Sequence, residues 1–286
     1  MARHCRVGIL QMTSSREPAE NVATAEALIR RAAAKGAELV ATPEMTTIVE
    51  RSRTRLLAAT HSEADDPALP RFRTLAADLG IHLLIGSMPI RVAQDRLANR
   101  SFLIAPDGSI AARYDKIHLF DVDLPDGESY RESALYRAGS EAVLVATPLA
   151  AIGLSICYDL RFPHLYRLLA GAGAEILFVP SAFTRRTGRA HWHTLLRARA
   201  IETGAFVIAP AQVGRHADGR TTFGHALAVS PWGEILLDLE ENVGEAVINL
   251  DLEAVAEARS RIPALRHDRP IRLQRIEAVA DGTRSV

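Results

Sequence analysis

The sequence predicts an α/β fold of the four-layer αββα type, in which two mixed β-sheets pack face to face and helices cover both outer surfaces. Short apolar segments alternate with amphipathic helical segments along most of the 286 residues. Turn sequences at 106–109 and 231–233 join strands without a helix between them. Because a (β/α)8 barrel needs a helix after every strand, these hairpins argue against a barrel. The apolar content of 48% is enough for one large core.

The first half of the chain contains most of one predicted sheet. Helices are expected at 18–35 and in two stretches between 53 and 80, separated by a polar turn. The hairpin at 106–109 makes the two strands beside it antiparallel. A polar segment over 121–140 is expected to be a long loop, and such loops in compact domains are usually functional. The predicted strands of this half are 5–12, 38–41, 81–89, 99–105 and 110–116.

The second half begins with two strands joined by a short turn and then alternates strands with helices. Helices are expected at 164–171, 190–203 and 252–261. Strand 245–250 is expected to pair with the hairpin that precedes it. We expect a single domain over 1–270, followed by an arginine-rich tail over 271–286. The predicted strands are 142–146, 151–156, 175–180, 205–210, 225–230, 234–239 and 245–250.

Composition limits the classes of partner and the compartment. The formal net charge is zero, which argues against nucleic acid, a membrane surface or a polyanion as the partner. The only cysteines are Cys5 and Cys157, so a disulfide scaffold is not expected and a reducing cytoplasm is favoured. The first ten residues lack the apolar segment of a signal peptide, and no uninterrupted apolar stretch has membrane length. We therefore expect a cytoplasmic protein.

Cys157 lies in a stretch, 153–163, that passes from an apolar strand to a charged loop and then to a helix. A thiol beside a helix N-terminus feels the positive end of the helix dipole, which favours the thiolate. The alternative is a plain buried core cysteine. A lone cysteine becomes a candidate nucleophile only when partner residues are found.

Two further residues share the position of Cys157 just after an apolar strand. Glu44 follows the strand at 38–41, although a solvated loop glutamate is the alternative. Lys116 lies at the end of the strand at 110–116 and is one of only two lysines, the other being Lys35 at an exposed helix end. Lysine supplies a compact point charge that arginine does not, although chance explains its placement equally well.

These three residues make a coherent hydrolytic set if the fold brings them together. A carboxylate with a pKa raised by burial takes the thiol proton, the sulfur attacks a carbonyl or nitrile carbon, and the ammonium stabilises the oxyanion. The ammonium also needs an anionic neighbour that holds it in place. Glu132 is the first candidate, and Glu128 and Asp115 are the alternatives.

These motifs resemble the nitrilase superfamily of carbon–nitrogen hydrolases over nearly the whole chain. Residues 42–44, 116–118 and 153–163 resemble its three catalytic blocks, and Glu132-Ser133 resembles the segment of its second glutamate. Within the superfamily the chain is most similar to the Nit branch. The segments that carry this closer similarity are 116–125, 180–183, 187–192, 196–202, 224–225 and 231–233.

The resemblance implies an amidase that forms a thioester on Cys157 with release of ammonia, after which water activated by Glu44 frees the acid. Lys116 and the backbone N–H of Tyr158 would form the oxyanion site, and Tyr130 and Phe183 would contact the substrate. No metal ion or organic cofactor is implied. The expected assembly is a homodimer through the helices near Cys157 and at 190–203, with the tail crossing to the second copy.

Segments 180–183, 197–199 and 214–216 resemble enzymes that hydrolyse deaminated glutathione, rather than ω-amidases that act on α-ketoglutaramate. Both substrates are amides that carry a 2-oxo acid group. Arg185 and Arg186 depart from the expected pattern, and they either bind a substrate carboxylate or are solvated loop residues. The alternative from another class is a non-catalytic binding protein on the same fold.

Metal-dependent and nucleotide-dependent functions have little support. His191 and His193 offer two imidazoles, but no His-Glu-x-x-His motif accompanies them, so they are expected on a helix surface or dimer face. Gly153-Leu-Ser-Ile-Cys157 lacks the second glycine of a serine-hydrolase nucleophile elbow. No Gly-x-Gly-x-x-Gly motif or P-loop is present.

Overall fold

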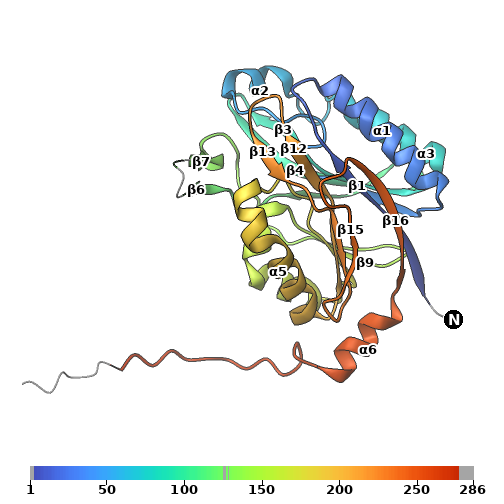
Figure 1. Ribbon diagram of the computed structural model, residues 1–286, viewed down its shortest axis with the longest axis vertical. Coiled ribbons are helices and arrows are strands. Elements are labelled where there is room, and N and C mark those ends of the chain that lie inside the picture. Colours follow the sequence, from blue (N-terminus) through green and yellow to red (C-terminus); the bar gives the residue numbers. More distant parts are fainter. Residues whose placement is uncertain (1–2, 125–126, 128, 277–286) are drawn as a thin grey trace, which may run out of the picture.

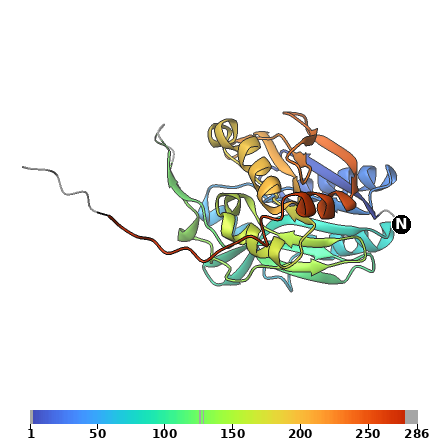
Figure 2. The same cartoon turned by 90° about the horizontal axis from the view of Figure 1, so that it is seen from below.

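Two β-sheets pack face to face in the computed structural model, with helices on the outer surface of each sheet (Figures 1 and 2). The structure describes residues 3–124, 127 and 129–276. Within this part, α1 and α3 contact the first sheet, and α4 and α5 contact the second sheet. The predicted αββα sandwich is therefore confirmed.

The first sheet has eight strands among the described residues, in the spatial order β13-β12-β1-β2-β3-β4-β5, with β16 also paired to β1. The pairs β1–β2 and β2–β3 are parallel, whereas β3–β4 and β4–β5 are antiparallel, as the predicted hairpin requires. Its strands are β1 (His4–Met12), β2 (Leu39–Ala41), β3 (His82–Ala93), β4 (Arg96–Ile104), β5 (Ile110–Asp115), β12 (Ala211–Arg215), β13 (Thr221–Phe223) and β16 (Gly244–Asp251).

The second sheet has six described strands in the order β15-β14-β11-β10-β9-β8. Its centre is parallel, because β10 pairs in parallel with both β9 and β11. The polar turn that follows β9 therefore lies at the same sheet edge as the ends of β10 and β11. The strands are β8 (Leu144–Ala146), β9 (Ala151–Leu154), β10 (Ile176–Phe178), β11 (Phe206–Ala209), β14 (Leu227–Val229) and β15 (Ile235–Asp238).

The helices lie near their predicted positions. α1 begins with Pro18 at its first turn, where proline costs no hydrogen bond, and α3 ends at Gly80 in the left-handed conformation. α4 also begins with a proline, Pro163. The bounds are α1 (Pro18–Ala34), α2 (Arg53–Ala59), α3 (Ala68–Leu79), α4 (Pro163–Gly171), α5 (Arg185–Thr203) and α6 (Glu253–Arg261).

The strands of the first sheet divide their side chains between two hydrophobic cores. Leu39 and Ala41 of β2 face the core between the sheets, whereas Val40 faces the core beneath α1 and α3. This alternation follows from the two-residue period of a strand. Both faces of β2 are covered by apolar groups, which explains why the strand is continuously apolar. The polar residues that directly follow β2, including Glu44, are therefore buried in the interior.

Two sequence predictions about strand pairing need correction. β16 pairs with β1, in antiparallel register from His4 opposite Asp251 to Gln11 opposite Gly244, and not with the preceding hairpin. The predicted loop at 121–140 contains a small hairpin, β6 (Asp121–Asp123) with β7 (Ser129–Arg131), and a 3₁₀ turn at Glu132–Ala134. Partners far apart in sequence leave no local signal, and three-residue strands are too short to show a period.

The start of α5 also differs from the prediction. The helix begins at Arg185, five positions before the predicted residue 190, and the hydroxyl of Thr184 caps it by accepting from the Thr187 N–H. Gly188 lowers local helix propensity but is needed there, because a Cβ on it would come within 2.3 Å of the Phe223 ring. Arg185 and Arg186 therefore lie in the first turn of a helix and not in a loop.

The chain leaves the body after α6. Described residues from 262 to 276 contain no helix or strand and extend away from both sheets (Figures 1 and 2). Three apolar side chains in this segment, those of Ile271, Leu273 and Ile276, are 91%, 95% and 78% exposed. Within the described part of the chain, no helix is both long enough and apolar enough to cross a membrane.

Candidate active site

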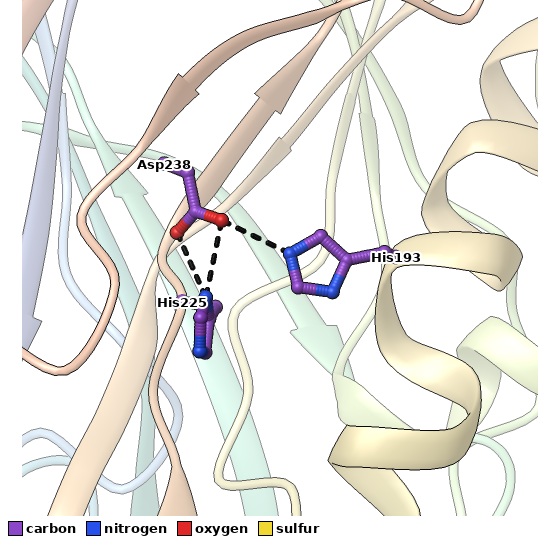
Figure 3. A group of neighbouring side chains, drawn as sticks. All are labelled: His193, His225 and Asp238. Carbon is purple, nitrogen blue, oxygen red and sulfur yellow. Dashed lines mark hydrogen bonds and ion pairs between the residues drawn. The ribbon is translucent and has the colours of Figure 1, made fainter.

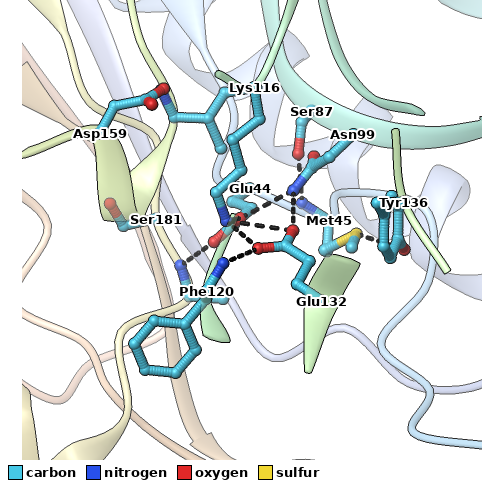
Figure 4. Close-up of polar contacts among 12 residues, drawn as sticks. Glu44, Met45, Ser87, Asn99, Lys116, Phe120, Glu132, Tyr136, Asp159 and Ser181 are labelled. Atoms are coloured by element: carbon cyan, nitrogen blue, oxygen red, sulfur yellow. Dashed lines mark hydrogen bonds and ion pairs between the residues drawn. The ribbon is translucent and has the colours of Figure 1, made fainter. Parts of the chain in front are cut away.

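The residues predicted to work together do converge. Glu44 follows β2, Lys116 follows β5 and Cys157 follows β9, and all three are buried. Lys116 Nζ lies 2.9 Å from Glu44 Oε1 (Figure 4). The Cys157 thiol and the Glu44 carboxylate line the same cavity and are close enough to shift each other's pKa. One carboxylate, one ammonium and one thiol from three distant segments therefore meet in one place.

Lys116 is held between two carboxylates. Its Nζ lies 2.9 Å from Glu44 Oε1 and 2.9 Å from Glu132 Oε2, and Glu132 also accepts the Phe120 backbone N–H at 2.7 Å (Figure 4). We call Lys116, Glu44 and Glu132 the lysine cluster. Burial alone would lower the pKa of Lys116, but the charges of the two glutamates raise it well above its ordinary value. The ammonium is therefore charged at neutral pH.

Of the three predicted neighbours of Lys116, the structure places Glu132 against it. Asp115 instead pairs with Arg100, whose Nε is 2.6 Å from Asp115 Oδ1. Glu128 lies outside the described residues. A 3₁₀ turn that begins at Glu132 directs the chain from β7 back toward β4. The Leu97 N–H of β4 donates to the Leu135 carbonyl just after this turn, so the Glu132 side chain can reach the interior.

Glu44 is an ionised carboxylate with several donors. Besides Lys116, it accepts from Asn99 Nδ2 at 2.9 Å and from the Ala182 N–H at 2.8 Å. Burial acts to raise the pKa of Glu44, but the Lys116 charge and the hydrogen bonds outweigh it and lower the pKa below its ordinary value. The sequence-based expectation of a raised pKa at Glu44 is therefore wrong, because it counted burial and omitted the ammonium.

The pKa of Cys157 shifts in the opposite direction from that of Glu44. Burial and the Glu44 charge raise the pKa of the Cys157 thiol well above its ordinary value, and the Lys116 charge only partly offsets them. The sequence-based expectation that Cys157 prefers the thiolate form is therefore wrong. The lysine cluster already has two carboxylates for one ammonium, so a thiolate would add a second uncompensated negative charge in a buried site.

The turn that carries Cys157 is held in an unusual conformation. Cys157 begins a 3₁₀ helix over Cys157–Arg161 and has a φ of 50°, in the left-handed region that non-glycine residues rarely adopt. Its N–H donates to the Pro180 carbonyl at 3.0 Å. The buried Asp159 accepts from the Ile156 N–H at 2.9 Å and from the Tyr114 hydroxyl at 2.6 Å. These bonds hold the nucleophile turn against the end of β5.

Asn99 is a site residue that the sequence analysis missed. Its Nδ2 donates to Glu44 at 2.9 Å and lies 3.3 Å from Glu132, so it bridges the two carboxylates of the lysine cluster (Figure 4). The backbone carbonyl of Asn99 accepts the Lys116 backbone N–H at 2.9 Å. Asn99 begins the predicted strand 99–105 beside the polar residues Arg100 and Ser101, so no local pattern marked it as buried. Its burial requires a partner, which the two carboxylates supply.

A cavity of about 390 Å³ contains all seven predicted site residues in its wall. One side of the cavity is aromatic. The Phe120 ring lies between the rings of Tyr158 and Tyr130, with 5.0 Å between its centroid and each of theirs. Phe183 lines the cavity as well. The residues predicted for catalysis and for substrate contact therefore share one cavity, which is large enough for a small organic substrate.

The arginines proposed from the sequence as carboxylate ligands do not line this cavity. Arg185 pairs instead with Glu241, with 3.0 Å between Nη2 and Oε1. The side chains in the cavity wall that carry a guanidinium are those of Arg51, Arg53, Arg131 and Arg220. The sequence offered no means to distinguish these four from the other surface arginines.

A second polar group lies on the outer side of the second sheet. His193 Nε2 is 3.0 Å from Asp238 Oδ2, and His225 Nδ1 is 3.0 Å from Asp238 Oδ1 (Figure 3). We call these three residues the aspartate cluster. Their donor atoms lie within 4.8 Å of one another, a spacing that metal ligands also show. His193 thus contacts β15 rather than working with His191, whose Nδ1 is 3.3 Å from Arg161.

Comparisons with known proteins agree with this geometry. The carbon-nitrogen hydrolase family matches residues 6–260. A deaminated glutathione amidase of Synechocystis is 44% identical over 263 residues, covering 90% of this chain and 96% of that protein. A deaminated glutathione amidase of Yersinia enterocolitica is 39% identical, covering 93% and 94% of the two chains.

The fold comparison adds a solved structure. The crystal structure of the C. elegans NitFhit protein superposes with a TM-score of 0.87 at 36% identity, covering 94% of this chain and 66% of that one. The family match, the sequence identities and the fold similarity all identify the same protein family. The chain belongs to the carbon–nitrogen hydrolase family, and it is an amidase that hydrolyses carbon–nitrogen bonds.

Proposed function

We propose that this amidase hydrolyses deaminated glutathione, with Cys157 as nucleophile, Glu44 as general base and acid, Lys116 as oxyanion ligand, and Glu132 holding Lys116 in place. The observation that carries the mechanism is the buried Glu44–Lys116 ion pair in the same cavity wall as Cys157. The substrate is supported by the relatives named deaminated glutathione amidase, of which this chain covers 96% and 94% in the two proteins described above.

The first step forms a thioester. Glu44 is ionised and the Cys157 thiol is protonated, so the proton moves to the carboxylate as the sulfur attacks the acyl carbon. The charge that develops on the carbonyl oxygen is stabilised by the Lys116 ammonium and by the N–H of Tyr158. The Tyr158 N–H lies in the first turn of the 3₁₀ helix, where a backbone donor has no partner within the helix.

The first step ends when the carbon–nitrogen bond breaks, Glu44 gives its proton to the leaving amine, and an acyl thioester remains on Cys157. The second step returns the enzyme to its starting state. Glu44 then takes a proton from water, which attacks the thioester, and the sulfur leaves with that proton. The expected release of ammonia needs correction for deaminated glutathione, because its amide nitrogen belongs to cysteinylglycine, which is therefore the leaving amine. Ammonia leaves only from a primary amide such as α-ketoglutaramate. Both reactions release 2-oxoglutarate.

The mechanism is tested by Cys157→Ala, with Cys5→Ala as the matched control. We expect the release of 2-oxoglutarate from deaminated glutathione to fall by at least about 10³-fold in the first variant. Cys5 is buried in the core, where burial raises its pKa to about 12, so its removal should leave turnover per folded molecule within about 3-fold of wild type. Turnover that survives in Cys157→Ala would exclude this mechanism.

The substrate is tested by comparing kcat/KM on deaminated glutathione and on α-ketoglutaramate. A higher value on the first supports the proposal, and a clear preference for the second identifies the chain as an ω-amidase. If neither amide is turned over while either one binds, the alternative of a non-catalytic binding protein is supported instead. The same assay therefore separates all three functions.

The proposal includes a homodimer in the cytoplasm, with residues 1–270 as the domain and the tail crossing to the second copy. Support comes from the exposed apolar tail and from Leu168 of α4, Ile201 of α5 and Trp232, which are 62%, 55% and 55% exposed. Both cysteines are unpaired, which suits a reducing compartment.

Light scattering should give a dimer mass for the full chain and weaker association after truncation at residue 270. A monomeric full chain would overturn this assembly.

A further inference from the structure

The four arginines in the cavity wall differ in how far protein groups use their guanidinium donors. Three of the four cavity arginines are already engaged. Arg51 donates to the Tyr130 hydroxyl at 3.0 Å, Arg53 donates to the Ala134 carbonyl at 3.1 Å, and Arg131 donates to both oxygens of Asp123 at 2.8 Å. Arg53 and Arg131 are also about half exposed, with side-chain exposures of 50% and 52%. The fourth arginine, Arg220, is less exposed and has no side-chain hydrogen bond at its Nε among the described residues.

Arg220 is 20% exposed, and its Nε is buried with no hydrogen-bond partner among the described residues. The Asp218 carboxylate forms an ion pair with Arg220, but the 3.6 Å between Asp218 Oδ2 and Nη2 is beyond hydrogen-bond distance. Among the described residues, Asp218 Oδ2 also has no hydrogen-bond partner. A buried guanidinium donor without an acceptor is costly unless a ligand supplies one. The planar guanidinium offers paired donors that match the two oxygens of a carboxylate.

The turn that carries Arg220 is rigidly attached to the body. The Arg220 carbonyl accepts from the His216 N–H at 2.8 Å. The His216 ring is buried and bridges the Ser14 carbonyl at 2.8 Å and the Thr222 hydroxyl at 2.7 Å. The guanidinium is therefore presented from a fixed support, as a specific ligand contact requires.

Tyr136 lines the same cavity as Arg220 and the reacting groups. Among the described residues, its hydroxyl has the weak acceptor Met45 Sδ as hydrogen-bond partner, at 3.9 Å (Figure 4). Burial and the Glu132 charge raise the pKa of Tyr136, while the nearby Arg220 charge opposes them. The phenol is therefore neutral and can donate a hydrogen bond, and it lies within the electrostatic reach of both Glu132 and Arg220.

We propose that Arg220 and Tyr136 form a subsite for the 2-oxo acid end of the acyl group, with the carboxylate on the guanidinium and the phenol donating to an oxygen of the same group. This inference rests on the proposed function, because deaminated glutathione and α-ketoglutaramate share the 2-oxoglutaryl group. The subsite would select substrates by their acyl group and leave the choice of leaving amine to the rest of the cavity.

The test compares two amides that differ only in the carboxylate, α-ketoglutaramate and 4-oxopentanamide. Arg220→Gln should lower kcat/KM on α-ketoglutaramate by roughly 30- to 100-fold, mainly through KM, and change it on 4-oxopentanamide by less than about 3-fold. Arg220→Lys should recover part of the loss. Arg185→Gln is the matched control and should behave as wild type on both amides, because Arg185 does not line the cavity. An equal loss on both amides would indicate a structural role and overturn the proposal.

A binding measurement separates this inference from the proposed function. In the Cys157→Ala background, calorimetry should show 2-oxoglutarate binding that Arg220→Gln weakens by at least about 10-fold and Tyr136→Phe by a smaller factor. If the wild type hydrolyses neither amide but this difference is present, the proposed function fails and the subsite is retained. If 2-oxoglutarate binds equally with and without Arg220, or binds to neither protein, the subsite is excluded.

Discussion

The lysine cluster and the aspartate cluster have opposite charge arrangements with similar distances. In the first, an ammonium lies between two carboxylates, each at 2.9 Å (Figure 4). In the second, a carboxylate lies between two imidazoles, each at 3.0 Å (Figure 3). Burial separates them, since the side chains are 3–12% exposed in the lysine cluster and 20–33% exposed in the aspartate cluster.

This difference shows that burial, rather than distance, decides what a polar group does to its neighbours. The side chains of the lysine cluster are largely shielded from solvent, so each charge depends on the others, and the pKa shifts of Glu44 and its neighbour Cys157 run in opposite directions. In the aspartate cluster water reaches the charged atoms and screens them. We therefore expect chemistry from the first cluster and a modest contribution to stability from the second.

Replacing Lys116, the cation at the centre of the lysine cluster, should have the largest effect on stability and activity. Lys116→Met leaves two buried carboxylates without their cation, so we expect a loss of about 3–5 kcal/mol in the free energy of unfolding. The oxyanion also loses a donor, so kcat should fall by at least about 10³-fold. Urea unfolding and steady-state kinetics measure the two effects.

The matched control is the other lysine. Lys35 is 55% exposed and pairs with Glu245 at 3.1 Å, so Lys35→Met should change stability by less than about 1 kcal/mol and leave kcat unchanged. Comparable effects from the two substitutions would show that burial does not set the importance of the cation.

The pH profile of activity tests the opposite pKa shifts of Glu44, in the lysine cluster, and its neighbour Cys157. The lowered pKa of Glu44 places its protonation below its ordinary value of 4.5, and the raised pKa of Cys157 places thiolate formation above its ordinary value of 9.0. We therefore expect kcat/KM to change by less than about 2-fold between about pH 6 and about pH 8. The base is present above pH 4.5 and is lost as the pH falls through the lowered pKa. An acidic midpoint between pH 6 and 7 would contradict this assignment of charges.

The smallest effect is expected from the aspartate cluster. Asp238→Asn should cost about 1 kcal/mol of stability and leave kcat/KM within about 2-fold. Burial acts to raise the pKa of Asp238, but hydrogen bonds from His193 and His225 lower it below 3.8. The stabilisation is therefore complete above pH 3.8 and is lost as the pH falls through the lowered pKa. A stability difference between variant and wild type that grows on acidification would refute this account.

Much of the fold and three parts of the site could be predicted from local patterns. Strand and helix periodicity identified most elements of both sheets, and hairpin turns excluded a barrel. Glu44, Lys116 and Cys157 each follow an apolar strand, and such strand ends meet at one edge of a layered fold. These features depend on neighbouring residues in the chain, so the amino-acid sequence by itself determined them.

Only the tertiary structure decided the pairing of β16 with β1, the bridging role of Asn99 and the presence of Arg220 in the cavity wall. It also reversed the expected charge states of Glu44 and Cys157. Each of these depends on contacts between residues far apart in the chain, and a pKa depends on the sum of burial and every nearby charge. No local pattern contains that sum, because it exists only when the segments are folded together.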